Sequence, residues 1–180
     1  WESVHRELTR EGSADLNIAR IAVDRHAEVD PGKIALRLLD GDLGVSKISY
    51  GELRGRTNRF ANLLRTLAVR PQEVVASLLG RKAALYVTAL GSLKNGNIIC
   101  PLFEAFGPEP LRQRLALARV RVLITTPVLY RRKVQPLLEG LPDLKHVLVS
   151  VEAPEDEIPE ACLALEQLLA ESDDEWDIAP

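Results

Sequence analysis

The apolar positions in the middle of the chain follow two patterns, short continuous runs and stripes at helical spacing. A continuous run occupies residues 74–79, as is typical of a parallel strand buried on both faces. Residues 98–100, 121–125 and 146–151 are also predicted to be strands. Helical segments are predicted between them, over residues 82–94, 108–118 and from Pro127 onward, since proline suits the first helical position. The pattern predicts an α/β fold with a largely parallel sheet flanked by helices and joined by right-handed crossovers.

The first 70 residues show a different order of elements. A helix is predicted over residues 16–27 from its apolar spacing. Residues 34–39 read as a strand, and a glycine-rich turn leads into a second short strand that ends near Ser49. Apolar positions then form one helical stripe over residues 51–67. We therefore expect an opening β-hairpin that lies outside the regular part of the sheet.

Charge divides the chain into two parts. Residues 1–150 carry 23 Lys and Arg against 15 Asp and Glu, whereas residues 151–180 carry 11 Asp and Glu and no Lys or Arg. The first part is suited to binding phosphate groups, and the second is interpreted as an acidic linker with a short helix over residues 161–170 and a mobile end from Ser172. We therefore expect an amino-terminal α/β subdomain over residues 1–150, followed by an acidic linker over residues 151–180.

Composition disfavours several classes of function. Aromatic residues are few and the net charge is −3, which does not suit a nucleic-acid-binding protein. No apolar run reaches the roughly 18 residues that a membrane helix needs, and the first residues do not have the pattern of a secretory signal. Cys100 and Cys162 form no CxxC pair, as is usual in a reducing compartment. We expect a cytoplasmic protein that uses neither nucleic acid nor membrane.

Motifs that mark common active sites are missing from the sequence. It contains no GxxxxGK[ST], GxGxxG, GxSxG or HExxH pattern, and its histidines and cysteines lack the spacing of zinc ligands. Cys100 ends a predicted strand without a histidine near it in sequence, so it is interpreted as a small core residue. The residues alone thus predict an α/β fold with no catalytic residue and no metal site.

Three stretches stand out as motifs. Residues 48–53 read Ile-Ser-Tyr-Gly-Glu-Leu, residues 93–102 read Leu-Lys-Asn-Gly-Asn-Ile-Ile-Cys-Pro-Leu, and residues 103–110 read Phe-Glu-Ala-Phe-Gly-Pro-Glu-Pro. In this order and spacing they resemble the AMP-forming acyl-CoA synthetases of the adenylate-forming, AMP-binding superfamily. The third stretch is similar to the acetyl-CoA synthetase branch and argues against a peptide-synthetase adenylation domain.

The resemblance implies an acid–thiol ligase. Such an enzyme uses ATP and Mg²⁺ to convert a small, acetate-like carboxylate into an acyl-adenylate, and then transfers the acyl group to the thiol of CoA. The phosphate loop, magnesium ligand and catalytic lysine of the family have no matching positions here. The chain also begins without methionine. We therefore expect an amino-terminal fragment of an acetate or short-chain acid–CoA ligase, inactive alone, whose catalytic residues belong to the remainder of its own chain.

Part of a CoA site is implied by the same resemblance. It falls on the turn after the second motif and on a basic helix further along, that is, on Phe103, Glu104, Ala105, Arg131, Arg132 and Lys133. Arg131 can stack on a purine or bind a phosphate, although a basic run is as readily a solvated helix face. Glu104 would repel the CoA phosphates unless its side chain points away. Weak CoA binding is the most that we expect of the chain alone.

Two further interpretations follow. Within the motifs, Tyr50 and Glu52 are expected to begin and cap a helix, and Lys94-Asn95-Gly96 to end one, with Gly96 as the cap. For the chain as a whole, the alternative to an enzyme fragment is a non-catalytic interaction or regulatory module of the same fold, whose acidic linker docks a basic partner.

Overall fold

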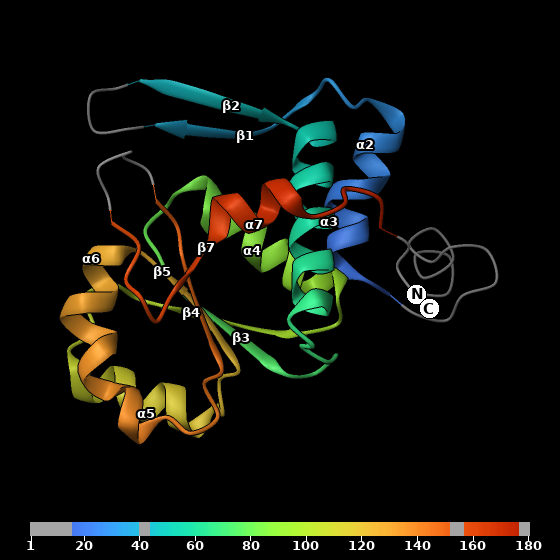
Figure 1. Ribbon diagram of the computed structural model, residues 1–180. Helices are drawn as coiled ribbons and strands as arrows, with labels where there is room; N and C mark the ends of the chain where they lie inside the picture. The colour runs from blue at the N-terminus through green and yellow to red at the C-terminus, as the bar shows by residue number, and fades with distance from the viewer. Residues whose placement is uncertain (1–15, 40–43, 152–156, 177–180) are drawn as a thin grey trace.

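The computed structural model describes residues 16–39, 44–151 and 157–176. It contains a five-stranded sheet, a separate two-stranded hairpin, and helices on both faces of the sheet (Figure 1). In chain order the elements are η1 (Arg20–Asp24), α2 (Arg25–Val29), β1 (Ile34–Leu39), β2 (Val45–Ser49), α3 (Tyr50–Thr66), β3 (Val74–Leu78), α4 (Ala83–Lys94), β4 (Ile98–Leu102), α5 (Pro108–Leu117), β5 (Val122–Thr125), α6 (Pro127–Leu129), η2 (Tyr130–Val134), η3 (Gln135–Gly140), β6 (His146–Val149), β7 (Leu163–Ala164) and α7 (Leu165–Glu171).

The five-stranded sheet has the order β4-β3-β5-β6-β7, and each neighbouring pair is parallel. This is the order of a doubly wound sheet, in which the connections turn in opposite directions on either side of β3. The predicted parallel sheet and the four predicted strands are confirmed. In such sheets ligands bind outside the carboxyl ends of the strands, near the point where the order reverses.

The strand β7 was not predicted. Leu163 and Ala164 pair with Leu148 and Val149 of β6, and the helix begins only at Leu165. The expectation of a helix from residue 161 was therefore wrong at its start. The sheet edge beside β6 offers backbone hydrogen bonds to a passing chain, and this outweighs the helical spacing of a short apolar segment.

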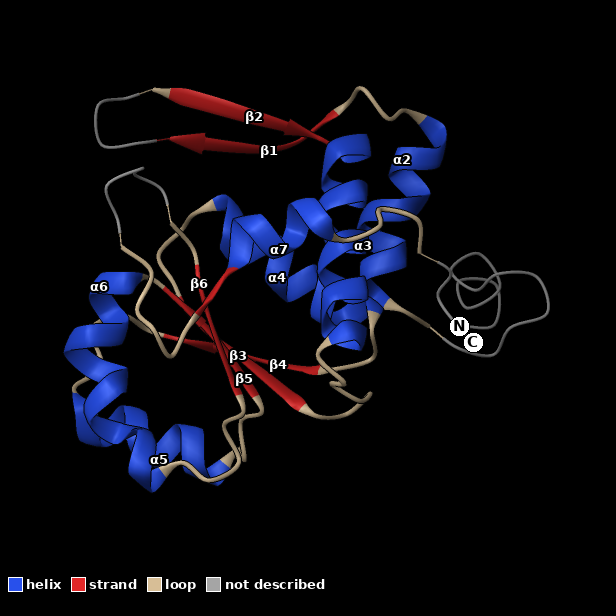
Figure 2. Ribbon diagram, in the orientation of Figure 1, coloured by secondary structure: helices blue, strands red, loops and turns tan. Residues whose placement is uncertain are grey.

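Strand residues alternate between two apolar clusters, one on each face of the sheet. Val75, Val122 and Leu148 pack with α3, α4 and α7, whereas their neighbours Ala76, Leu123 and Val147 pack with α5 and the helical segment that follows β5. Figure 2 shows the strands running between these two groups of helices. The continuous apolar runs in the sequence are explained by this burial on both faces.

The hairpin and the start of α3 agree with the sequence analysis. β1 and β2 are antiparallel and stand apart from the main sheet (Figure 1). α3 begins with a capping box, in which Ser49 Oγ accepts from Glu52 N at 3.2 Å and Glu52 Oε2 accepts from Ser49 N at 2.8 Å. The reciprocal pair satisfies two backbone donors at the helix start.

The second motif ends α4, as predicted. Gly96 follows the helix with a φ of +74°, and Asn97 N donates to Ser92 O at 2.9 Å. This is the hydrogen-bond pattern of a Schellman ending, which favours glycine in the left-handed region.

Residues 172–176 do not behave as the sequence analysis expected. They were predicted to be mobile, but they lie along α3, where Asn58 and Asn62 donate hydrogen bonds to their backbone. The rest of that predicted mobile end, residues 177–180, lies outside the described residues.

Candidate functional site

The structure brings the two predicted CoA-binding segments together. The turn after β4 lies against η2, because Lys133 Nζ donates to the carbonyl oxygen of Glu104 and, at 2.9 Å, to that of Phe106. Both segments lie on the side of the sheet that α5 and α6 cover (Figure 1). Lys133 therefore fixes the turn, and its ammonium is already engaged with two carbonyl groups.

Two aromatic rings and an arginine form the surface of this turn. The ring of Phe103 is exposed, with 67% of the residue accessible, and it meets the half-buried ring of Phe106 edge-on at a centroid distance of 6.0 Å. The guanidinium of Arg114 lies 4.2 Å from the centroid of Phe106. An exposed aromatic face next to a cation suits a flat heterocycle that carries negative charge.

The basic helix presents its two arginines outward because neighbouring residues of the helix are buried. Thr126 caps the helical segment by accepting from Leu129 N at 3.3 Å. Within the π-helix η2, Tyr130 and Val134 are buried, so Arg131 and Arg132 face solvent. The predicted helix from Pro127 onward is confirmed, and part of it is a π-helix. π-Helical turns are wider and occur often at functional sites.

Arg131 has one fixed partner, since its Nη2 donates to the carbonyl oxygen of Glu157 at 2.9 Å. The guanidinium group carries five donors, so most remain available for a phosphate. Arg132 is exposed next to it. An exposed guanidinium group is a suitable donor to an anion.

Glu104 points toward the carboxyl end of β3. An ideal Cβ placed on Gly80, which follows β3, would lie 3.3 Å from Glu104 Oε2. The side chain is half-buried, whereas Ala105 beside it is exposed. Phe103, Glu104, Gly80 and the helix after β5 thus gather at the carboxyl edges of β4, β3 and β5, where ligands bind in doubly wound sheets.

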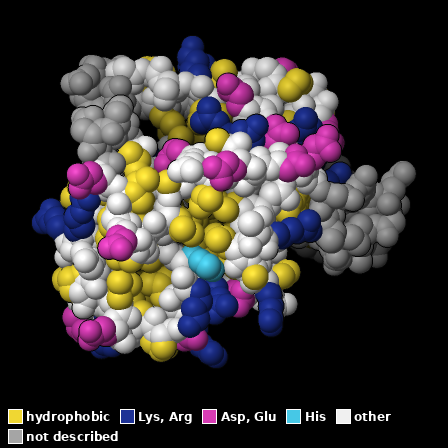
Figure 3. All heavy atoms as spheres, viewed as in Figure 1, with side chains coloured by type: hydrophobic (Ala, Val, Ile, Leu, Met, Phe, Trp, Pro, Cys, Tyr) yellow, Lys and Arg dark blue, Asp and Glu magenta, His cyan; other side chains and the backbone are white. Residues whose placement is uncertain are grey.

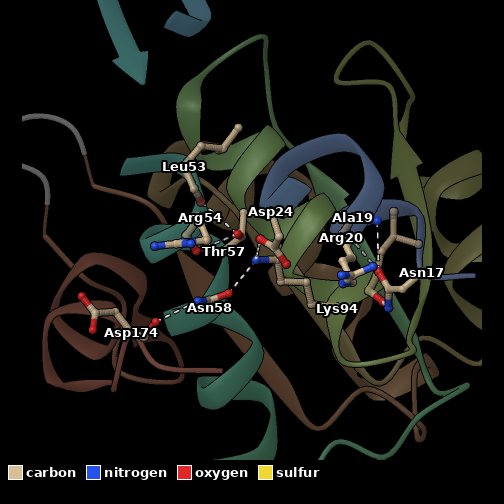
Figure 4. A network of polar contacts seen from close by, with 11 residues as sticks. Asn17, Ala19, Arg20, Asp24, Leu53, Arg54, Thr57, Asn58, Lys94 and Asp174 are labelled. Carbon is tan, nitrogen blue, oxygen red and sulfur yellow. Dashed lines mark hydrogen bonds and ion pairs between the residues drawn. The ribbon is translucent and has the colours of Figure 1, made fainter. Parts of the chain in front are cut away.

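A second polar cluster lies on the opposite face and is closed. Lys94 Nζ donates to Asp24 Oδ1 and to Asn58 Oδ1, each at 2.5 Å (Figure 4). The side chain of Lys94 is 0% exposed and that of Asp24 is 13% exposed. Burial raises the pKa of Asp24 and lowers the pKa of Lys94, and their attraction opposes both shifts. The cluster joins η1, α3 and α4, and its ammonium group is engaged with two partners within the protein.

This cluster was not predicted from the sequence, in which Lys94 is only part of a helix end and Asn58 has no expected role. The available signal was the position of polar residues on helix faces that are otherwise apolar. A lysine or asparagine at such a position is buried and needs a partner.

Both cysteines are free thiols in apolar surroundings. Burial raises the pKa of Cys100 and of Cys162, so both favour the neutral thiol. Cys100 is half-buried and packs against the apolar cluster beneath α5, so its interpretation as a buried core residue is confirmed only in part. Among residues 16–39, 44–151 and 157–176, no group of three or more His, Cys, Asp or Glu side chains is placed to hold a metal ion. In the same part of the chain no helix is long and apolar enough to cross a membrane.

Comparison with known proteins decides the family. A profile of the family described as AMP-binding enzyme matches residues 23–179. The chain belongs to this family. The family predicted from the three motifs is therefore confirmed.

Relatives in the AMP-binding enzyme family include acetyl-coenzyme A synthetases. The Bacillus subtilis (strain 168) protein is 34% identical over 151 residues, which cover 83% of this chain and 26% of that protein. The Phycomyces blakesleeanus protein is 36% identical over 114 residues, or 62% of this chain and 17% of that protein. The chain spans about a quarter or less of the length of these relatives.

Solved structures confirm the predicted fold. The crystal structure of a Brucella canis acyl-CoA synthetase superposes with a TM-score of 0.84 at 25% identity, over 99% of this chain and 31% of that one. An anthranilate CoA ligase in complex with anthranoyl-AMP superposes with a TM-score of 0.73 at 23% identity, over 88% and 29% of the two chains, and shares the fold.

Proposed function

We propose that this chain is the amino-terminal part of an AMP-forming acid–CoA ligase for acetate or another short carboxylate. In the first half-reaction the carboxylate attacks ATP, an acyl-adenylate forms, and pyrophosphate leaves. In the second, the CoA thiol attacks the acyl carbon and AMP leaves. The observation that carries the proposal is the family match over residues 23–179 together with the acetyl-coenzyme A synthetases among its relatives.

The adenylation step is assigned to the remainder of the enzyme. The motifs present here end or cap helices, and the buried ammonium of Lys94 is paired with the carboxylate of Asp24. ATP and Mg²⁺ are therefore proposed as ligands of the parent enzyme, and the chain alone is expected to catalyse no adenylation. Acetate-dependent ATP–pyrophosphate exchange tests this directly, and measurable exchange by the 180-residue chain would contradict it.

The part played by these residues is proposed to be the binding of CoA. The exposed ring of Phe103 offers a stacking surface for the adenine, with Ala105 leaving space beside it. Arg131 and Arg132 offer donors to the phosphates. Glu104 turns its carboxylate toward Gly80, and Lys133 holds the turn by its carbonyl groups rather than binding phosphate.

Ligand-observed NMR with the chain and CoA tests this assignment. The double variant Arg131→Ala/Arg132→Ala should weaken CoA binding by about tenfold or more, because charge-assisted hydrogen bonds are lost. Arg56→Ala is a matched control, since Arg56 is an exposed arginine on α3, on the other face of the sheet. Dephospho-CoA shows whether the 3′-phosphate is the group bound. Equal weakening by the control, or none by the double variant, would overturn the assignment.

The second candidate function is an interaction module that binds a basic partner. The observation in its favour is that Asp173 and Glu175 are exposed while their backbone is held on α3. A lysine-rich peptide should then bind in a salt-dependent manner and lose affinity with Asp173→Asn/Glu175→Gln. Binding that is independent of these carboxylates would count against this function.

A further inference from the structure

The last described residues are held on α3 mainly by their backbone. Asn58 Nδ2 donates to the carbonyl oxygen of Asp174, and Asn62 Nδ2 donates to those of Asp173 and Glu175, each at 2.8 Å. Asn58 and Asn62 are four residues apart, so their side chains share one face of the helix. Because these amides bind carbonyl groups, they recognise the path of the chain and not its acidic side chains.

Two side-chain contacts accompany the backbone contacts. Arg59 pairs with Asp174 at 3.3 Å between partly exposed groups, and such pairs contribute little. The guanidinium of Arg65 lies 3.8 Å from the centroid of the Trp176 ring. Figure 3 shows acidic and basic side chains interleaved on the face over α3 and α7. The asparagines are thus the contacts that define the position of the segment.

Asn58 has a second partner that determines which way its amide faces. Its Oδ1 accepts from Lys94 Nζ at 2.5 Å (Figure 4). An ammonium group has donors and no acceptor, so only the oxygen of Asn58 can face it. The NH₂ group must then point toward Asp174. A reversed amide would set donor against donor on one side and oxygen against oxygen on the other. Since the Lys94 side chain is fully buried, water does not relieve that arrangement.

We propose that Lys94 and Asn58 form a positioning device for residues 173–175. The buried ammonium sets the amide of Asn58, and Asn58 with Asn62 then clamps residues 173–175 on α3. Asp24 holds the ammonium in place from η1, so the device links the first helix of the described chain with its last segment. This inference does not depend on the proposed function.

The fluorescence of Trp176 in a Trp1→Phe background measures whether the segment is docked. Asn58→Asp keeps the size and the acceptor for Lys94, but offers no donor to Asp174. It should lower the ratio of docked to free segment about fivefold, with a red-shifted emission and stronger acrylamide quenching. Asn62→Asp should act in the same direction without touching Lys94. Arg56→Ala is the control, because Arg56 lies on the solvent side of α3.

The role of Lys94 is tested by Asp24→Asn/Lys94→Met, which removes both charges so that neither is left buried alone. Asn58 is then free to turn. With two orientations equally populated, docking should weaken about twofold, while Asn62→Asp keeps its full effect in this background. Circular dichroism establishes that each variant is folded. Unchanged quenching in Asn58→Asp and Asn62→Asp would overturn the clamp, and unchanged quenching in the folded double variant would overturn the role of Lys94. If Asn58→Asp does not fold, Asn62→Asp decides the clamp alone.

Discussion

Lys94→Met should destabilise the protein severely. Methionine matches the length of the lysine side chain, but it leaves the carboxylate of Asp24, whose side chain is 13% exposed, without its cation. Breaking a buried pair by removing one partner costs about 3–5 kcal/mol. For a chain of this length, 1 kcal/mol corresponds to roughly 2–4 °C in Tm. The expected fall in Tm is therefore about 6–20 °C.

Urea unfolding at pH 7 and at lower pH checks both the size and the cause of this loss. Burial raises the pKa of Asp24 in the folded state above its unfolded value, so the folded variant takes up a proton before the unfolded chain does. The stability of Lys94→Met should thus recover as pH falls through the raised pKa toward the unfolded one. Asp24→Asn/Lys94→Met removes both charges and should lie within about 1.5 kcal/mol of the wild type, because the desolvation penalty disappears with the attraction. A Lys94→Met midpoint equal to that of the wild type, or a loss independent of pH, would refute the buried ion pair.

Three further predictions concern single contacts. Gly91→Ala would place a Cβ 2.8 Å from Phe60 Cβ, between α4 and α3. Overpacking costs about 1–3 kcal/mol and the gain in helix propensity is roughly 1 kcal/mol, so urea unfolding should show a net loss of stability. A more stable variant would contradict this. Ser49→Ala removes half of the capping box and should cost about 1 kcal/mol in the same assay, whereas an unchanged midpoint would argue against the cap. Hydrogen bonds from Arg112 lower the pKa of Glu109 from 4.5 to about 2. Any stability due to this pair is therefore present above pH 4.5 and disappears toward pH 2. Carboxyl NMR titration should show the low pKa, and Arg112→Gln should return it toward 4.5.

The elements that sequence could predict are those with a long, regular apolar pattern. The stripe over residues 51–67 became α3, and the runs at 74–79 and 121–125 became β3 and β5. Glu52 and Gly96 indicated the start of α3 and the end of α4, because the capping box and the left-handed glycine are local features. The three motifs identified the family for the same reason, since each lies within one short stretch. The capping role of Ser49 itself was not predicted.

What could not be predicted depends on contacts between distant parts of the chain. β7 has two residues, and only its pairing with β6 distinguishes it from the helix that follows. Lys94 contacts partners that lie 36 and 70 residues earlier in the chain. The apolar patterns of the helices involved do not predict these contacts. Residues 173–175 are bound by their carbonyl groups, which every residue possesses. This highly charged segment was therefore predicted to be mobile, although asparagine side chains of α3 bind its backbone.

The cations on the two faces of the sheet differ in their partners, and this difference separates a structural role from a binding role. Beneath α3 and α4 the buried ammonium of Lys94 is satisfied by Asp24 and Asn58 within the protein. Beside η2 the guanidinium groups of Arg131 and Arg132 face solvent, next to an exposed aromatic ring. A charge that is paired within the protein fixes the positions of its partners and binds no ligand. A solvent-facing cation at the carboxyl edge of a strand contributes little to stability and is available to bind phosphate. Substitutions at Lys94 should therefore change unfolding and segment docking but leave CoA affinity per folded molecule unchanged, and Arg131→Ala/Arg132→Ala should do the reverse.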